Sequence, residues 1–251
     1  MIVHDILTRR VVNYRNYTSF YDLVASSISN LKYLNLGRTS ITDSILIKIL
    51  QRTPLLTGLW LEENFHLTDD AIINLGSLCP LLTVIKLRNC GRISDAGLIP
   101  LLQSLGSTLK AIGISYTMAT DKALMTASVS STSLHTLFMN YLTIDSESTL
   151  LKCLTRLGPR LKTLSMSGID IVTDNTIDLI VNCCHSLERL DISYAGDDRT
   201  ISERGLESLQ SLRPRLQNVV FRGIDGISPK FEKFMESIFE TSQFWLEPTL
   251  K

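Results

Sequence analysis

Hydrophobic positions recur along the chain in a block of the form L-x-x-L-x-L, in which the first, fourth and sixth residues are apolar. The first clear copy contains Leu31, Leu34 and Leu36. Eight such copies begin at Leu31, Leu56, Leu82, Leu109, Leu134, Leu161, Leu187 and Leu216. Their starts are separated by 25, 26, 27, 25, 27, 26 and 29 residues, so the chain is an array of similar units rather than an irregular globule.

The second half of most copies carries a Ser or Thr followed by an acid. These pairs are Thr42–Asp43, Thr68–Asp69, Ser94–Asp95, Thr120–Asp121, Thr173–Asp174 and Ser202–Glu203. A hydroxyl at this position caps the free amides of a helix start, and an acid in the first turn complements the helix dipole. The fifth copy has the weaker Asp145–Ser146, and the last has Pro229 where the acid would stand. A short helix is therefore predicted after each apolar block.

A strand, a turn, a helix and a return in units of this length match the leucine-rich-repeat pattern. The predicted fold is an α/β leucine-rich-repeat solenoid, or horseshoe, of about eight repeats, with a parallel sheet on the concave side and helices on the convex side. Strands are expected near residues 33–36, 58–61, 84–87, 111–114, 136–139, 163–166, 189–192 and 218–221. Antiparallel pairing there would contradict the fold.

Three regions are predicted along the chain. Residues 1–30 are expected to form a degenerate repeat or N-terminal cap, residues 31–228 the solenoid, and residues 229–251 a capping helix and tail. The tail contains Phe244, Trp245 and Leu246. These side chains either cover the end of the last repeat or form a short linear motif for a partner.

Charge and cysteine content narrow the class of function. Lys and Arg total 25, as do Asp and Glu, so no basic excess supports direct nucleic-acid binding. The sequence contains no run of about 18 apolar residues, so no membrane span is predicted. The five cysteines are scattered, which favours reduced thiols in the cytoplasm or nucleus. The four histidines lie in different units, so neither a catalytic site nor a cofactor or metal site is predicted, and the chain is not expected to be an enzyme.

The side chain between the second and third apolar positions of each block should project from the concave face of the sheet, away from the core, because strand side chains alternate. That row is Asn35, Trp60, Lys86, Gly113, Phe138, Ser165, Asp191 and Val220. Two aromatic residues on a solvent-facing row favour a binding surface for a protein around Trp60, Lys86, Phe138 and Asp191. Alternatively, a capping segment of the same chain covers them.

A second row follows directly after the strands. It contains Arg38, Glu63, Arg88, Tyr116, Tyr141 and Tyr194. Tyrosines at equivalent positions of three copies suggest a polar and aromatic stripe beside Phe138. We therefore include Arg88, Tyr116, Tyr141 and Tyr194 in the predicted protein-binding surface, with ordinary surface as the alternative.

The third copy resembles a known family in detail. It runs from Leu82 to Asp95, with Cys90 at a characteristic cysteine position and Ile-Ser-Asp at the helix start. Leu78-Cys79-Pro80 at a helix end is similar, and Cys184-His185 echoes it. These motifs resemble the cysteine-containing leucine-rich-repeat family. It includes F-box substrate receptors of cullin-RING ubiquitin ligases, antagonist-of-mitotic-exit-type proteins and a subunit of yeast nucleotide excision repair.

The chain departs from this family in two respects. Most other copies lack the cysteine, and no F-box is found, since that motif begins near Leu-Pro and the first proline here is Pro54. The chain is thus either a short relative without an F-box or part of a longer protein. The resemblance implies a substrate- or regulator-binding subunit linked to the ubiquitin system. The alternative is a structural scaffold subunit of a larger assembly, including a nuclear DNA-repair or chromatin complex.

Overall fold

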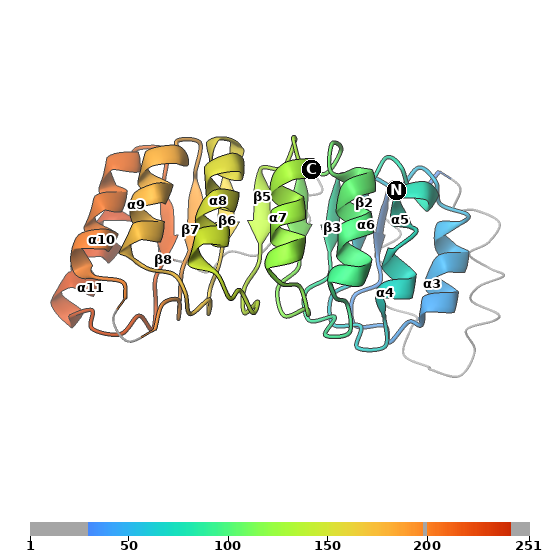
Figure 1. Ribbon diagram of the computed structural model, residues 1–251, viewed down its shortest axis with the longest axis horizontal. Coiled ribbons are helices and arrows are strands. Elements are labelled where there is room, and N and C mark those ends of the chain that lie inside the picture. The colour runs from blue at the N-terminus through green and yellow to red at the C-terminus, as the bar shows by residue number, and fades with distance from the viewer. Residues whose placement is uncertain (1–29, 198–199, 242–251) are drawn as a thin grey trace.

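The computed structural model describes residues 30–197 and 200–241. Within these residues, eight parallel strands form one sheet in chain order, and each strand pairs with the strands before and after it (Figure 1). The strands are β1 (Tyr33–Asn35), β2 (Gly58–Trp60), β3 (Val84–Lys86), β4 (Ala111–Gly113), β5 (Thr136–Phe138), β6 (Thr163–Ser165), β7 (Arg189–Asp191) and β8 (Asn218–Val220). The parallel solenoid predicted from the repeats is confirmed.

The helices lie on one side of the sheet, in front of the strands in Figure 1. They are α3 (Asp43–Leu50), α4 (Asp69–Ile72), α5 (Leu75–Leu78), α6 (Asp95–Leu105), α7 (Asp121–Ser130), α8 (Glu147–Leu157), α9 (Asp174–Cys183), α10 (Glu203–Ser208) and α11 (Pro229–Ile238), with 3-10 turns η1 (Gly158–Arg160) and η2 (Leu209–Leu212). The second repeat carries two short helices in place of one. The opposite sheet face carries no described helix.

Each strand is one residue shorter than predicted, because the chain turns away immediately after it. The amide of Leu36 still donates to the carbonyl of Trp60 in the next strand, at 2.8 Å. Two residues later Arg38 has a φ of 61°, and Glu63 has 59° at the equivalent position. This left-handed residue reverses the chain toward its helix.

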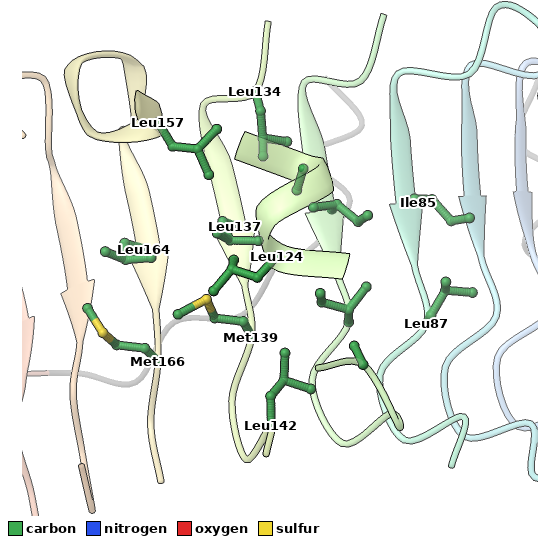
Figure 2. Packing of buried hydrophobic residues seen from close by; sticks show 14 of the residues in the cluster. Ile85, Leu87, Leu124, Leu134, Leu137, Met139, Leu142, Leu157, Leu164 and Met166 are labelled. Atoms are coloured by element: carbon green, nitrogen blue, oxygen red, sulfur yellow. The ribbon is translucent and has the colours of Figure 1, made fainter. Parts of the chain in front are cut away.

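The core lies between the sheet and the helices and runs unbroken along the solenoid. Figure 2 shows how the central strand residues Leu137 and Leu164 point to the same side as Met139 and Met166 of the next apolar position. All four are at most 1 % exposed. Each repeat therefore buries its apolar face only against its neighbours, as the repeat pattern requires.

The Ser/Thr–acid pairs connect the repeats as well as starting the helices. Oδ1 of Asp43 accepts the backbone N–H of Thr68 at 2.9 Å, and Oδ2 accepts the Thr68 hydroxyl at 2.6 Å. The same two bonds join Asp69 to Ser94, Asp95 to Thr120 and Asp174 to Ser202. Thr68 in turn caps its own helix through the amide of Asp70. One acid thus both complements its helix dipole and holds the cap of the following repeat.

The end of the described chain extends the sheet. After α11 the amide of Glu240 donates to Gln217, and the carbonyl of Glu240 accepts from Val219, beside β8. Met235 and Phe239 are buried against the last repeat. Residues 1–29 of the expected N-terminal cap and the tail residues Phe244, Trp245 and Leu246 lie outside the described residues. No described helix is long and apolar enough to cross a membrane.

Candidate protein-binding surface

The strand register aligns the predicted concave row along the sheet. Successive pairs place Trp60 beside Lys86, and Phe138 between Gly113 and Ser165. The first residue of each strand points to the same face, since strand side chains alternate. The concave face therefore carries two parallel rows of side chains, of which one was predicted from the sequence.

The expectation that Trp60 and Phe138 stand in solvent is wrong. Their exposed fractions are 5 % and 6 %, and those of Lys86 and Asp191 are 5 % and 7 %. A Cβ added at Gly58 would meet the Trp60 ring at 2.7 Å, so that ring lies across the glycine. The Trp60 and Tyr33 ring centroids are 6.1 Å apart. Because Gly58 leaves room, the Trp60 ring lies along the sheet. Replacing Trp60 or Phe138 is therefore not expected to be neutral for stability.

A buried hydrogen-bond chain crosses the same face from β4 to β7. The hydroxyl of Ser165 donates to Oδ1 of Asn140 at 2.6 Å and lies 3.2 Å from Oδ2 of Asp191. Oδ1 of Asn140 also accepts from the backbone amide of Ser167, and the backbone amide of Asn140 donates to the Ser115 hydroxyl. This network holds the Asp191 carboxylate in place through hydrogen bonds within the protein.

An exposed row of tyrosines lies at the edge where the strands turn. We call Tyr116, Tyr141 and Tyr194 the tyrosine edge; their exposed fractions are 39 %, 42 % and 54 %. All three occupy the left-handed turn position, with φ values of 57°, 54° and 55°. The rings of Tyr116 and Tyr141 stack, with centroids 4.6 Å apart. The equal backbone geometry is why these side chains align across repeats.

Glycines at the same turn position of the next repeats make room for two of these rings. Gly168 and Gly223 have φ values of 64° and 67°. A Cβ on Gly168 would collide with the Tyr141 ring, and one on Gly223 with the Tyr194 ring. Tyr141 and Tyr194 therefore lean over the neighbouring repeat, which limits their rotamers. Little side-chain entropy would be lost when a partner covers them.

Arg88 does not occupy the position that we assigned to it. The residue equivalent to Tyr116 is Asn89, with a φ of 59°, and Arg88 precedes the turn. Its guanidinium carbon nevertheless lies 5.9 Å from the Tyr116 ring centroid, within cation–π distance. The structure thus brings Arg88, Tyr116 and Tyr141 together, whereas Tyr194 stands two repeats beyond Tyr141. Glycines at the equivalent turn position of other repeats were the sequence signal for the alignment of the tyrosines, and this signal was missed.

Two residues at the turn positions, Glu63 and Tyr116, have shifted pKa values of opposite direction. Arg38 donates two hydrogen bonds to the Glu63 carboxylate, at 2.9 and 2.8 Å, which lowers the pKa of Glu63. Burial, followed by the neighbouring Tyr141, raises the pKa of Tyr116. The Tyr116 phenol is therefore protonated at neutral pH and can donate a hydrogen bond to a partner.

The described residues contain no cluster of three or more His, Cys, Asp or Glu that could hold a metal ion. The five cysteines are free thiols in the structure. Burial raises the pKa of Cys79 and of Cys90 to about 11 and also raises that of Cys153. Cys183 is only partly buried, and its pKa is lowered because the Cys184 thiol, 3.9 Å away, stabilises the thiolate.

We expect native alkylation at neutral pH to modify Cys183 before the other four cysteines, because only its sulfur combines access with a lowered pKa. Peptide mapping after a short iodoacetamide treatment measures this order. Intact mass without reductant should show five reduced thiols and no bound zinc. A disulfide, a zinc adduct or faster labelling of Cys90 would contradict this assignment.

Comparison with known proteins agrees with the repeat structure. A leucine-rich-repeat family model matches residues 27–50 and 78–102. The chain folds as a leucine-rich-repeat solenoid. It is 37 % identical over 87 residues to F-box/LRR-repeat protein 12 of Arabidopsis thaliana, a match that covers 34 % of this chain and 22 % of that protein. The chain thus spans about a fifth of that relative's length.

A solved structure of the Rad7 and Elc1 complex in yeast has a similar fold. The TM-score is 0.52 at 14 % sequence identity, and the match covers 83 % of this leucine-rich-repeat chain and 67 % of the other chain. At that identity the likeness extends to the fold alone.

Proposed function

We propose that this leucine-rich-repeat protein is a binding subunit that holds another protein against the tyrosine edge and the adjoining concave face. The exposed, aligned rings of Tyr116, Tyr141 and Tyr194 carry the proposal. Tyrosine is enriched among residues that dominate binding energy, because it offers a large apolar area and a hydroxyl with few rotatable bonds. Arg88 beside Tyr116 adds a second residue type favoured at interfaces.

Trp60, Lys86, Phe138 and Asp191 form the inner side of the proposed surface. Their side chains expose little surface for first contact, whereas the tyrosine edge is exposed. We therefore assign first contact to the tyrosines. Lys86 and Asp191, on opposite sides of the middle of the sheet, would set the partner's orientation by charge.

The double variant Tyr116→Asn/Tyr141→Asn tests this assignment. Asparagine already occupies the equivalent turn position at Asn89, so the backbone should tolerate it. We expect binding to weaken by about 2 kcal/mol or more, roughly 30-fold in Kd, if the rings are dominant contacts. Calorimetric titration with the isolated partner measures the change.

Two convex substitutions serve as controls. Val129→Asn removes a side chain that is 63 % exposed on α7, and Lys122→Ala removes a charge from the same helix. Both should leave Kd within twofold of the unmodified chain. Full binding by the tyrosine variant together with loss in the convex variants would favour the scaffold function, in which the convex helices make the contacts.

We further propose that the partner is a substrate or regulator handled by the ubiquitin system. The similarity to an F-box/LRR-repeat protein supports this link. Affinity capture of the tagged chain, followed by mass spectrometry, should recover ubiquitin-ligase subunits together with a partner protein, and only the partner protein should be lost with Tyr116→Asn/Tyr141→Asn. Recovery of a stable complex without any ligase subunit would contradict the ubiquitin proposal but would still agree with the proposed protein binding.

A further inference from the structure

Two cysteines at the end of α9 bring their sulfur atoms together on the helix side of the solenoid. Cys183 is the last residue of the helix and Cys184 is its C-cap. Successive side chains of a helix normally diverge, but Cys184 departs from helical geometry, with a φ of −98° against about −63° in a helix. The two sulfur atoms are 3.9 Å apart. Closing this separation to a disulfide bond requires a movement of about 2 Å.

A glycine of the neighbouring repeat makes room for both sulfur atoms. Gly158 follows α8, which packs beside α9 (Figure 1). A Cβ added at Gly158 would lie 2.9 Å from the Cys183 sulfur and 2.8 Å from the Cys184 sulfur. Both sulfur atoms therefore face the same glycine, and a larger residue at that position would push them aside.

The two thiols differ in their access to reagents. Cys183 is only partly buried, whereas Cys184 is 0 % exposed. Contact with the Cys184 thiol lowers the pKa of Cys183, while contact with Cys183 and then burial raise the pKa of Cys184. A small reagent from solution thus reaches Cys183 first, and Cys184 reacts with what forms there. The remaining cysteines are fully buried in other repeats: Cys79, Cys90 and Cys153.

We propose that Cys183 and Cys184 form a redox modification site, at which hydrogen peroxide oxidises the pair reversibly to a disulfide between adjacent residues. The Cys183 thiolate attacks the peroxide, so that an S–O bond forms, the O–O bond breaks and the leaving hydroxide takes up a proton as water. Cys184 then attacks the sulfenic sulfur of Cys183. The S–S bond forms, the S–O bond breaks and hydroxide leaves with the Cys184 proton as a second water. The two thiols lose two electrons and the peroxide gains them.

The backbone makes such a disulfide easy to reduce. Adjacent Cα atoms are about 3.8 Å apart across a trans peptide, whereas the Cα atoms of ordinary disulfides are about 4.4–6.8 Å apart. A disulfide that departs from ordinary geometry is strained and is reduced more readily. The pair is therefore reduced in the untreated chain, and a dithiol should restore it after oxidation.

The modification site is separate from the proposed binding surface. The chain after α9 returns to the start of β7, whereas the tyrosine edge follows the ends of the strands. The inference therefore goes beyond protein binding, and its test requires no partner. The second thiol also protects the first, because it consumes the sulfenic acid of Cys183 before more peroxide oxidises it irreversibly.

Thiol counting on the folded chain tests the proposal. After the peroxide is removed and the chain is unfolded, iodoacetamide should label three cysteines, against five in the untreated chain. Peptide mapping should place the loss of two hydrogen atoms on the peptide that contains Cys183 and Cys184. Dithiothreitol should restore both labels. Labelling of all five cysteines after peroxide, or loss of two thiols elsewhere in the chain, would overturn the proposal, and this measurement needs no variant.

Cys184→Ser separates the two chemical steps. Without the second thiol the sulfenic acid on Cys183 should persist, so its labelling by dimedone should rise severalfold over the unsubstituted chain. Cys153→Ser is the matched control, because it removes a buried cysteine of the neighbouring repeat and should still lose two thiols to peroxide. Equal dimedone labelling of Cys183 in the unsubstituted chain and in Cys184→Ser, or a disulfide between two chains, would rule out the adjacent pair.

Discussion

Replacing Leu87 by alanine should lower the free energy of unfolding by about 2–5 kcal/mol, the usual cost of truncating a core leucine. Leu87 is 0 % exposed and lies in the apolar layer between the sheet and the helices (Figure 2). The layer is continuous from repeat to repeat, so neighbouring units cannot close the resulting cavity without losing their own contacts. Leu61, at the same position of the preceding repeat and equally buried, should behave in the same way.

Leu81→Ala is the matched control for this prediction. Leu81 lies directly before the third repeat and loses the same atoms, but its side chain is 50 % exposed. The control should change stability by no more than about 0.5 kcal/mol. Urea denaturation followed by circular dichroism measures both variants. A loss below about 1 kcal/mol for Leu87→Ala would mean that the packing of the third repeat is misassigned.

Asn64→Ala should cost about 3 kcal/mol or more, because several buried backbone groups would each lose a partner worth about 1–3 kcal/mol. Nδ2 of Asn64 donates to the carbonyls of Leu36 and Leu61, at 2.7 and 2.9 Å. Oδ1 accepts from the amides of Thr39 and Ile41. One fully buried amide thus holds the turns of two successive repeats together.

A cysteine at this position should partly rescue the loss. In the next repeat Cys90 occupies the equivalent place, and its sulfur lies 3.1 Å from the carbonyl of Leu61, which corresponds to the Asn64 bond to Leu36. We expect Asn64→Cys to unfold at a higher urea concentration than Asn64→Ala. Asn74→Ala, at an exposed residue that makes no side-chain capping bond, should have little effect. Equal stability of Asn64→Ala and Asn74→Ala would contradict the proposed role.

The sequence predicted the sheet because its signal is repeated eight times and each copy constrains the others. The position of each strand follows from three apolar residues, as Leu134, Leu137 and Met139 illustrate, and their burial is confirmed. The helix starts were predictable for the same local reason, since a Ser/Thr hydroxyl caps the amides beside it. The bonds from Asp95 to the next cap were not predicted, because they join residues 25 apart.

The candidate surface was harder to predict. Alternation places Trp60 and Phe138 on the concave face, but their exposure depends on what else covers that face, which alternation does not determine. Arg88 was misaligned because it lies six residues after Leu82, whereas the turn residue lies seven residues after the start of each block. Gly168 and Gly223 carry the conformational signal, since glycine readily adopts a positive φ.

Photo-cross-linking from the tyrosine edge tests the central claim most directly. A benzophenone amino acid in place of Tyr141 keeps a large aromatic group at the turn, and the same group in place of Val129 projects from the convex helix α7. If the chain binds a protein through the tyrosine edge, irradiation should link the captured partner to position 141 and not to position 129. Cross-linking from position 129 with none from position 141 would contradict the account.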